Sequence, residues 1–467
     1  MNAKTKKIFI SSLAVIIFSI IAGFYYHNSR RVSVDLPPDS SAAEAEIAGS
    51  NLGFFYLKKY KDPQFNLKAS YVRTAISWGI FQPDAPTYDG DGNVNNFKWD
   101  NSQEQLITKL NNDGKKIIPS IRTVSQGVKT GKNNWALYSL VEGVRNNQGN
   151  PITPKIECKK DGGTDYKASA LPVDLTTNSD AQYAYSKNYY NFVKAAIKYF
   201  KDKGINFEIV VIENEMNSPN FWCGTPDQYI RLYKTAVKAV RDVDPNIKVA
   251  DGGLQGFALD ALSQDKNGQG IAFTNGEAMI NANMFAIGDL ANFHHYQSSE
   301  NITRIISYLK DKNKDTNGKE KPIFTNEIGS REGSESGQEM VKKFAYLLMQ
   351  DVRPIVWFSP NGAGEGNNDG ALIDDNGDPI GQNLKAFITS TKFLDGSIIS
   401  REDLSDENRN EFHFKLQEQE VTIMWVKQKP MKLDSIGSNC ERYDYQGNKI
   451  TSDSYTLDSS PVLVVCP

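Results

Sequence analysis

The chain has 467 residues, of which 39% are hydrophobic and 23% charged, and its formal net charge is -3. This composition is that of a globular protein, and the absence of a basic excess argues against nucleic acid as a partner. The length allows one large domain and a smaller one, each with its own core.

The first 26 residues have the pattern of a membrane anchor. Three lysines lie within residues 1–7, and residues 8–26 contain no charge. This stretch is long enough to span a bilayer, and the lysines before it favour a cytoplasmic amino terminus. We therefore predict a membrane anchor over residues 1–26, a polar linker over 27–50, and an extracytoplasmic body, periplasmic or at the cell surface. Cleavage as a signal peptide would instead give a secreted protein.

Residues 51–393 alternate between short apolar runs and stretches with helical spacing. Continuous apolar runs of this kind are typical of parallel strands that are covered on both faces. Eight strands alternating with helices predict an α/β protein with a (β/α)8 TIM barrel, whose active site is expected at the carboxyl ends of the strands. The predicted strands are centred on Leu52, Val72, Ile117, Val210, Val249, Phe293, Phe324 and Val356.

Two further segments do not follow this alternation of strands and helices. Residues 123–180 are rich in Gly, Asn, Lys and Asp, and are too long for a bare connection, so we expect them to fold over the barrel mouth. Residues 394–467 contain short alternating strands with turn residues between them and no helical pattern. They predict a small all-β, sandwich-like domain at the carboxyl terminus.

Polar and aromatic residues follow several of the predicted strands, and a barrel would bring them together at one face. Two of them, Glu215 and Glu327, are carboxylates that each follow an asparagine. Hydrolysis of a glycosidic bond needs one carboxylic acid to protonate the leaving oxygen and one carboxylate to attack the anomeric carbon. The other candidates for this face, as substrate-binding residues, are Arg73, Trp78, Asn214, Trp222, His294, Tyr296 and Trp357.

Each candidate also has a structural interpretation. Glu215 or Glu327 could be a solvated strand-end charge or could cap a helix, and His294 could be a packed core histidine. Trp222 could serve as a platform for a sugar ring or could simply pack in the core. Glu213 is expected to be a structural carboxylate, because it points away from Asn214 on a strand.

At these positions the chain resembles the clan A glycoside hydrolases. The stretch "EIVVIENEMN" is similar to the clan's Asn-Glu-Pro motif after strand four, with Met216 in the place of proline. The resemblance implies Glu215 as the acid/base and Glu327, in "FTNEIG", as the nucleophile. The β-rich tail is similar to the accessory sandwich of the xylosidase-like members. The same resemblance implies roles for four further residues. They are Asn214 as the partner of the substrate 2-hydroxyl, Arg73 as the barrel arginine, Tyr296 as the contact to the nucleophile and Trp357 as the eighth-strand aromatic.

The sequence therefore predicts a retaining glycoside hydrolase that cleaves a polysaccharide or glycoconjugate outside the cytoplasm by double displacement. A glycan-binding protein that has lost catalysis, or a transglycosylase of envelope polysaccharide assembly, are the alternatives. No cofactor or metal is expected, because the chain has only four histidines and no CxxC spacing. The partners expected are a poly- or oligosaccharide substrate and, through the amino-terminal segment, a membrane.

Four cysteines suit two disulfides in an oxidising compartment. Cys158 and Cys223 lie in loops after strands three and four, on the same face of the predicted barrel, and Cys440 and Cys466 share the β domain. Domain order therefore predicts the pairs Cys158–Cys223 and Cys440–Cys466, whereas four buried thiols are the structural alternative.

Overall fold

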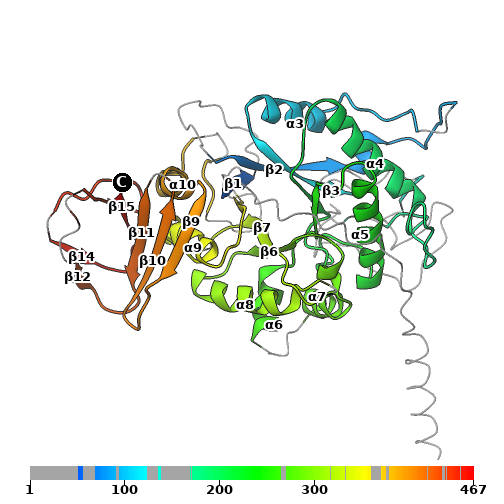
Figure 1. Ribbon diagram of the computed structural model, residues 1–467. Coiled ribbons are helices and arrows are strands. Elements are labelled where there is room, and N and C mark those ends of the chain that lie inside the picture. Colours follow the sequence, from blue (N-terminus) through cyan, green and yellow to red (C-terminus); the bar gives the residue numbers. More distant parts are fainter. Residues whose placement is uncertain are drawn as a thin grey trace, which may run out of the picture. The chain divides into compact units, whose positions relative to one another are not determined.

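The computed structural model in Figure 1 describes most of the chain after residue 50. Residues 1–50, with the predicted anchor and linker, lie outside the described residues. In the described part of the chain, no helix is both long and apolar enough to cross a bilayer. The described residues are 51–55, 69–90, 94–123, 135–137, 169, 171–264, 270–315, 317–331, 333–358, 370–374, 378–417, 419–433, 437, 439–452 and 454–467.

Eight parallel strands form one sheet in the order β5-β4-β3-β2-β1-β8-β7-β6. Isolated parallel bridges, Ala250 to Leu290 and Leu254 to Phe293, link the segments of β5 and β6 and complete the ring. Each predicted strand centre falls within one of these strands, so the barrel prediction is confirmed. The strands are β1 (Leu52–Phe55), β2 (Tyr71–Ser77), β3 (Lys116–Arg122), β4 (Ile209–Ile212), β5 (Lys248–Ala250), β6 (Ala291–His295), β7 (Ile323–Ile328) and β8 (Ile355–Trp357).

Helices follow the strands and surround the barrel (Figure 1). The start of α5 shows how local sequence sets such a helix: Thr225 and Gln228 form a reciprocal capping box, and Pro226 occupies the first turn. The helices are α2 (Trp78–Phe81), α3 (Ser102–Asn112), α4 (Lys187–Asp202), α5 (Pro226–Arg241), α6 (Gly256–Ser263), α7 (Ile271–Asn281), α8 (Ile302–Lys312), α9 (Ser336–Met349) and α10 (Gly381–Leu394), with short 3-10 turns η2 (Met284–Ala286), η3 (Ser299–Asn301) and η4 (Gly333–Glu335).

The strands separate two apolar cores because successive side chains on a strand point to opposite faces. One core fills the barrel and the other, much larger, lies between the strands and the helices. Gly53 faces the barrel interior, where a Cβ atom would lie 2.7 Å from the Cβ of Tyr71. The inner core consists of Tyr71, Ile118, Ile209, Val211, Ala250, Leu290, Phe324 and Val356.

The carboxyl-terminal part is an antiparallel β domain, as predicted. A five-stranded sheet has the order β13-β15-β11-β10-β9, and β12 pairs with β14. Tyr346 on α9 packs its ring against Phe412 and Trp425, and its hydroxyl donates to Asn410 Oδ1 at 3.1 Å. The strands are β9 (Ile398–Asp403), β10 (Arg409–Leu416), β11 (Glu420–Val426), β12 (Met431–Leu433), β13 (Glu441–Asp444), β14 (Tyr455–Leu457) and β15 (Val462–Cys466).

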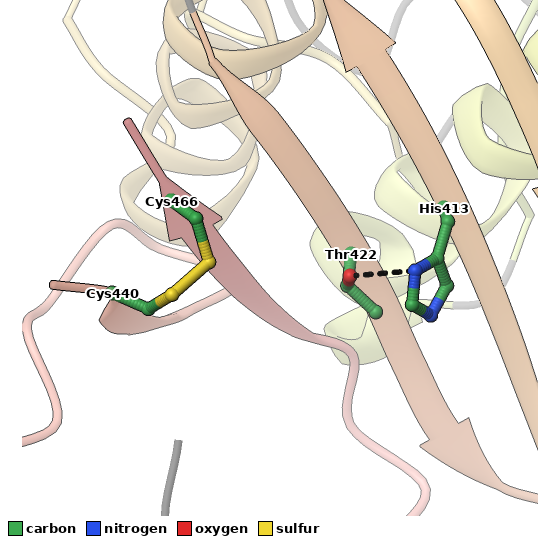
Figure 2. Close-up of a disulfide and its surroundings, with 4 residues drawn as sticks. All are labelled: His413, Thr422, Cys440 and Cys466. Atoms are coloured by element: carbon green, nitrogen blue, oxygen red, sulfur yellow. Dashed lines mark hydrogen bonds between the residues drawn. A yellow bond between two sulfur atoms is a disulfide. The ribbon is translucent and has the colours of Figure 1, made fainter. Parts of the chain in front are cut away.

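The disulfides agree with the predicted pairing where they can be followed. Figure 2 shows the bond between Cys440 and Cys466, which joins the start of β13 to the end of β15. Cys223 is also disulfide-bonded. Cys158, the partner predicted for it, lies outside the described residues, as does most of the predicted 123–180 insertion.

Candidate active site

Strand β2 and the carboxyl ends of β4, β6 and β7 bring together five of the predicted site residues, and a sixth, Tyr296, contacts one of them. Parallel strands of a barrel all end at the same face, so residues far apart in sequence converge there. Each of the five is less than 10% exposed. They are Arg73, Asn214, Glu215, His294 and Glu327, and direct contacts connect all of them.

Glu327 is held on both carboxylate oxygens. The Arg73 guanidinium forms an ion pair with Oε2, and the Tyr296 hydroxyl donates to Oε1 at 2.7 Å. The register between β7 and its neighbours β6 and β8 shifts just before Glu327. Such a bulge changes the direction of the side chains that follow it. In a regular strand, Phe324 and Asn326 would point into the barrel and Glu327 would point outward. The bulge lets the side chain of Glu327 reach the barrel mouth as well.

The electrostatic surroundings of Glu327 favour its ionised form. Burial alone would raise the pKa of this carboxyl, but the charges of His294 and Arg73, with the hydrogen bonds from Tyr296 and Arg73, outweigh burial and lower it. Burial and the charge of Glu327 raise the pKa of Tyr296 well above its usual range, so its hydroxyl keeps the proton that it donates. Glu327 is therefore a carboxylate near neutral pH.

The end of β4 has an unusual backbone. Glu213 and Glu215 have φ angles of 68° and 40°, in the left-handed region that side chains other than glycine rarely adopt. Glu215 N–H donates to the carbonyl of Gly252 at 3.0 Å. A Cβ atom at Gly252 would lie only 2.9 Å from the amide nitrogen of Asn214, so only glycine permits this approach. The turn aims Asn214 at Arg73, which donates to its Oδ1.

Glu215 is bound by residues that follow β5 and β6. Its Oε1 lies 2.9 Å from Nδ1 of His294, and its Oε2 accepts a hydrogen bond from Nε2 of Gln255. Nε2 of His294 lies 3.0 Å from Oδ1 of Asn326. Because this amide oxygen can only accept, Nε2 of His294 carries hydrogen. Nδ1 then faces Oε1 of Glu215 across the 2.9 Å contact.

A further row of buried polar residues fixes this arrangement. Asn292 accepts from Asn326 N–H at 3.1 Å and donates from Nδ2 to Oδ1 of Asn326 at 2.8 Å and to the carbonyl of Asp251 at 3.1 Å. These bonds define the orientation of both amides, which in turn defines the tautomer of His294. Burial raises the pKa of Asp251 to about 7, against the hydrogen bonds that its carboxylate accepts from Gly253 and Asn292.

Glu213 has a structural role, as the sequence indicated. It accepts hydrogen bonds from Thr123 N–H at 2.8 Å and from the Ser169 hydroxyl at 2.5 Å. The bond from Thr123 extends the contact between the ends of β3 and β4 beyond the regular ladder. Its backbone, rather than its carboxylate, helps to place Asn214 and Glu215.

The three tryptophans predicted to contact substrate belong to the outer core instead. Trp78 stacks on Phe192 and donates to Gln82, Trp222 donates to the carbonyl of Thr225, and Trp357 packs on Phe344 and donates to the carbonyl of Gly370. All three are at most 2% exposed. For Trp357 the reason is strand alternation: Val356 points into the barrel, so its neighbour points toward the helices. These predictions are corrected, since the indoles of Trp78, Trp222 and Trp357 are core residues.

Two phenylalanines that the sequence analysis missed lie beside the site. The ring of Phe358 lies 5.1 Å from that of Phe55 and 6.1 Å from that of Tyr296, and Arg73 lies over the ring of Phe55 at 5.5 Å. Both phenylalanines are partly exposed. Alternation could have found them, because Gly53 and Val356 two positions earlier face the interior. Gln255 was also missed, because its contact with Glu215 depends on the loop after β5.

The site also offers ligand atoms of the kind that bind metals. One atom each of Glu215, His294 and Glu327 lie within 4.8 Å of one another. However, the Arg73 guanidinium already neutralises Glu327, and both oxygens of Glu215 have hydrogen-bond partners. A cation would have to displace these contacts and lie beside a buried positive charge, so the donor set fits proton transfer and nucleophilic attack better than metal binding.

Comparison with known proteins gives one match to a family model. A family model described as glycosyl hydrolase family 53 matches residues 175–251, the segment that contains β4 and β5. Among curated proteins, no sequence matches this chain.

Solved structures share the fold over nearly the whole described chain. One is a family 39 glycoside hydrolase from the gut symbiont Bacteroides cellulosilyticus WH2, with a TM-score of 0.59, 16% identity and coverage of 89% of this chain and 81% of that chain. Others are a GH30 endoxylanase from Clostridium papyrosolvens C71 (TM-score 0.52, 14% identity, coverage 90% and 97%) and a monomeric beta-xylosidase from Caulobacter crescentus CB15 (TM-score 0.52, 12% identity, coverage 90% and 97%). The resemblance predicted from the strand-end residues is thereby confirmed at the level of the fold.

Proposed function

We propose that this protein is a retaining glycoside hydrolase, with Glu327 as nucleophile and Glu215 as acid/base. The observation that carries the proposal is the pair of carboxyl groups at the ends of β7 and β4, held in different environments around one histidine. Glu327 is bound by a guanidinium and a phenol, whereas Glu215 contacts only the uncharged amide of Gln255 and the imidazole of His294. Such a difference separates a nucleophilic carboxylate from a general acid.

The spacing of the two groups supports retention of configuration. An oxygen of Glu215 and an oxygen of Glu327 lie within 4.8 Å of each other. Retaining enzymes place their carboxyl groups about 5–5.5 Å apart, whereas inverting enzymes need about 6.5–9.5 Å to admit a water molecule. The site is thus arranged for direct attack by Glu327 on the sugar.

The reaction would proceed in two displacements. In the first, a carboxylate oxygen of Glu327 bonds to the anomeric carbon while the glycosidic C–O bond breaks and the proton of Glu215 passes to the leaving oxygen. In the second, Glu215 takes a proton from water, whose oxygen attacks the anomeric carbon and releases Glu327. Asn214, oriented by Arg73, would donate to the hydroxyl next to the anomeric carbon. The rings of Phe55 and Phe358 suit the apolar face of a sugar.

The substrate we propose is a poly- or oligosaccharide outside the cytoplasm, reached by a protein that its amino-terminal segment anchors to the membrane. The uncharged stretch of residues 8–26 and the disulfide between Cys440 and Cys466 support this location. Fractionation of cells that produce the full chain tests it. Recovery in the cytoplasmic fraction with reduced cysteines would contradict the location.

The activity is tested with Glu327→Ala and Glu215→Ala against a panel of polysaccharides and activated aryl glycosides. Each variant should lose at least about 1,000-fold in kcat, since removal of a covalent nucleophile or general acid removes a step of the mechanism. Azide should rescue Glu327→Ala with inversion at the anomeric carbon and Glu215→Ala with retention, which distinguishes the two roles. Glu300→Ala, an exposed carboxylate on η3, is the matched control and should retain full activity.

Product analysis separates hydrolysis from the two alternatives. New free reducing ends in the absence of an acceptor indicate hydrolysis, whereas lengthened chains with few reducing ends indicate a transglycosylase. Both use the covalent intermediate on Glu327. Glycan binding without any turnover, unchanged in Glu327→Ala, would contradict the enzyme proposal and leave a binding protein.

A further inference from the structure

Arg122, the last residue of β3, points into the barrel mouth but has no part in the site described so far. It pairs in register with Ser77 of β2. On the same face of β3, Ile118 belongs to the inner core, and Ser120 accepts a hydrogen bond from Nε of Arg73 at 3.4 Å. Because side chains two residues apart share a face, Arg122 lies one step beyond Ser120, toward the open end of the barrel.

The guanidinium of Arg122 lacks the partners that buried arginines normally have. The residue is 7% exposed, and both Nε and Nη2 are buried without a hydrogen-bond partner. Among the described residues, no carboxylate oxygen lies within 4.0 Å of it. Glu213, which directly follows the neighbouring strand β4, accepts hydrogen bonds from Thr123 and Ser169 on its two carboxylate oxygens instead. Burial raises the pKa of Glu213, and the charge of Arg122 acts against that rise.

This arrangement is costly without a ligand. A buried charge with unused N–H groups loses its hydration without gaining hydrogen bonds in return, and native proteins rarely tolerate this without a functional reason. Burial lowers the pKa of Arg122, while the charges of Glu213, Glu327 and Glu215 act in the opposite direction. Arg122 therefore lies within electrostatic range of both proposed catalytic carboxyls.

An anion bound in the mouth would satisfy these groups. A guanidinium presents a planar fork of donors that matches a carboxylate or a sulfate, and such charge-assisted pairs are stronger than bonds to neutral hydroxyls. Arg73 cannot supply this contact, because Glu327, Asn214 and the carbonyl of Asn326 already occupy it. Arg122, by contrast, keeps Nε and Nη2 without a partner.

We propose that Arg122 is a specificity-determining residue that binds an anionic group, a uronic acid carboxylate or a sulfate ester, on the glycan held beside Glu215 and Glu327. The inference rests on the proposed hydrolase function and adds the substrate class: acidic rather than neutral glycans. The same reasoning assigns the anionic group to the β3 side of the mouth, next to Glu213.

The test uses pairs of substrates that differ only in charge. Uronate-containing polysaccharides are compared with their carboxyl-reduced forms, and sulfated ones with their desulfated forms, for the wild type, Arg122→Met and Arg122→Lys. We expect the wild type to favour one charged form at least tenfold in kcat/KM, and Arg122→Met to lower that ratio at least tenfold. The lysine variant should fall between them, because it keeps the charge without the fork. Arg231→Met, which removes a guanidinium paired with Asp227 on α5, should keep the wild-type ratio.

Two outcomes would overturn the inference while leaving the hydrolase intact. Equal turnover of charged and neutral forms by the wild type is one, and equal losses on both forms in Arg122→Met is the other. If the wild type hydrolysed no glycan, the proposed function would fail separately. Calorimetric titration of the wild type and Arg122→Met with the same oligosaccharide pairs would still decide the role of Arg122: tighter binding of the charged form that depends on Arg122 supports it, and equal affinity refutes it.

Discussion

Removing the charge of Arg73 should move the acidic limb of the pH–rate profile. Arg73 and Glu327 form an ion pair whose side chains are 5% and 10% exposed. An opposite charge in such contact lowers a carboxyl pKa by about 1–3 units, so in Arg73→Met the pKa of Glu327 should rise by that amount. Each unit corresponds to about 1.4 kcal/mol between the two protonation states. In the proposed mechanism Glu327 attacks as a carboxylate, so activity should be lost as pH falls through its pKa, and the loss should begin at higher pH in the variant.

The assay is kcat/KM against pH for three proteins. Arg73→Lys keeps the positive charge but loses the fork that also holds Asn214, so it should lower the maximum rate and leave the acidic limb within about half a pH unit of the wild type. Tyr296→Phe removes a hydrogen bond that an uncharged donor makes to Glu327, and should move the limb less than Arg73→Met, which removes a full charge. A folded Arg73→Met whose acidic limb coincides with that of the wild type would refute the reasoning.

Three further predictions concern other parts of the molecule. The double variant Cys440→Ser/Cys466→Ser opens a loop with a sequence separation of 26, and should lower the unfolding free energy of the β domain by about 3.5 kcal/mol in the chain-entropy model; unchanged denaturation would contradict this. Phe358→Ala should raise KM several-fold, whereas Trp78→Phe should lower the melting temperature and leave KM unchanged; the reverse pattern would restore Trp78 to the site. Burial raises the pKa of the Asp251 carboxyl to about 7 in the folded wild type. The carboxyl therefore stabilises the fold below about pH 4 and loses this contribution as pH rises toward 7. The difference in melting temperature between the wild type and Asp251→Asn should accordingly become smaller or more negative between pH 5 and pH 8.

Much of the site followed from the sequence because barrel topology converts strand order into proximity. The site residues on or just after β2, β4, β6 and β7 could be named before the structure was known, since the strand pattern placed each of them. A position at the end of a strand does not by itself show whether the side chain points into the barrel or toward the helices. Trp357 follows Val356 and turns outward, whereas Phe358 takes the inward position. Alternation along the strand would have separated these two.

Other features could not have been predicted from local patterns. Glu327 reaches the mouth through a shift in strand register, and Glu215 through a left-handed backbone. Both features depend on contacts with neighbouring strands and with Gly252, and such tertiary contacts leave no local pattern in the sequence. The contact of Gln255 with Glu215 likewise depends on how the loop after β5 crosses the mouth.

The left-handed backbone at Glu213 and Glu215 has a consequence for attempts to make this protein more robust. Each such residue costs about 1–2 kcal/mol relative to glycine, which adopts the conformation freely. A selection that scores heat resistance alone gives no weight to the carboxyl of Glu215, and Glu215→Gly relieves this strain while it removes the proposed acid/base. Thermostabilisation of this enzyme requires a screen that counts turnover in every round, and the end of β4 is the segment to hold constant while the rest of the barrel is varied.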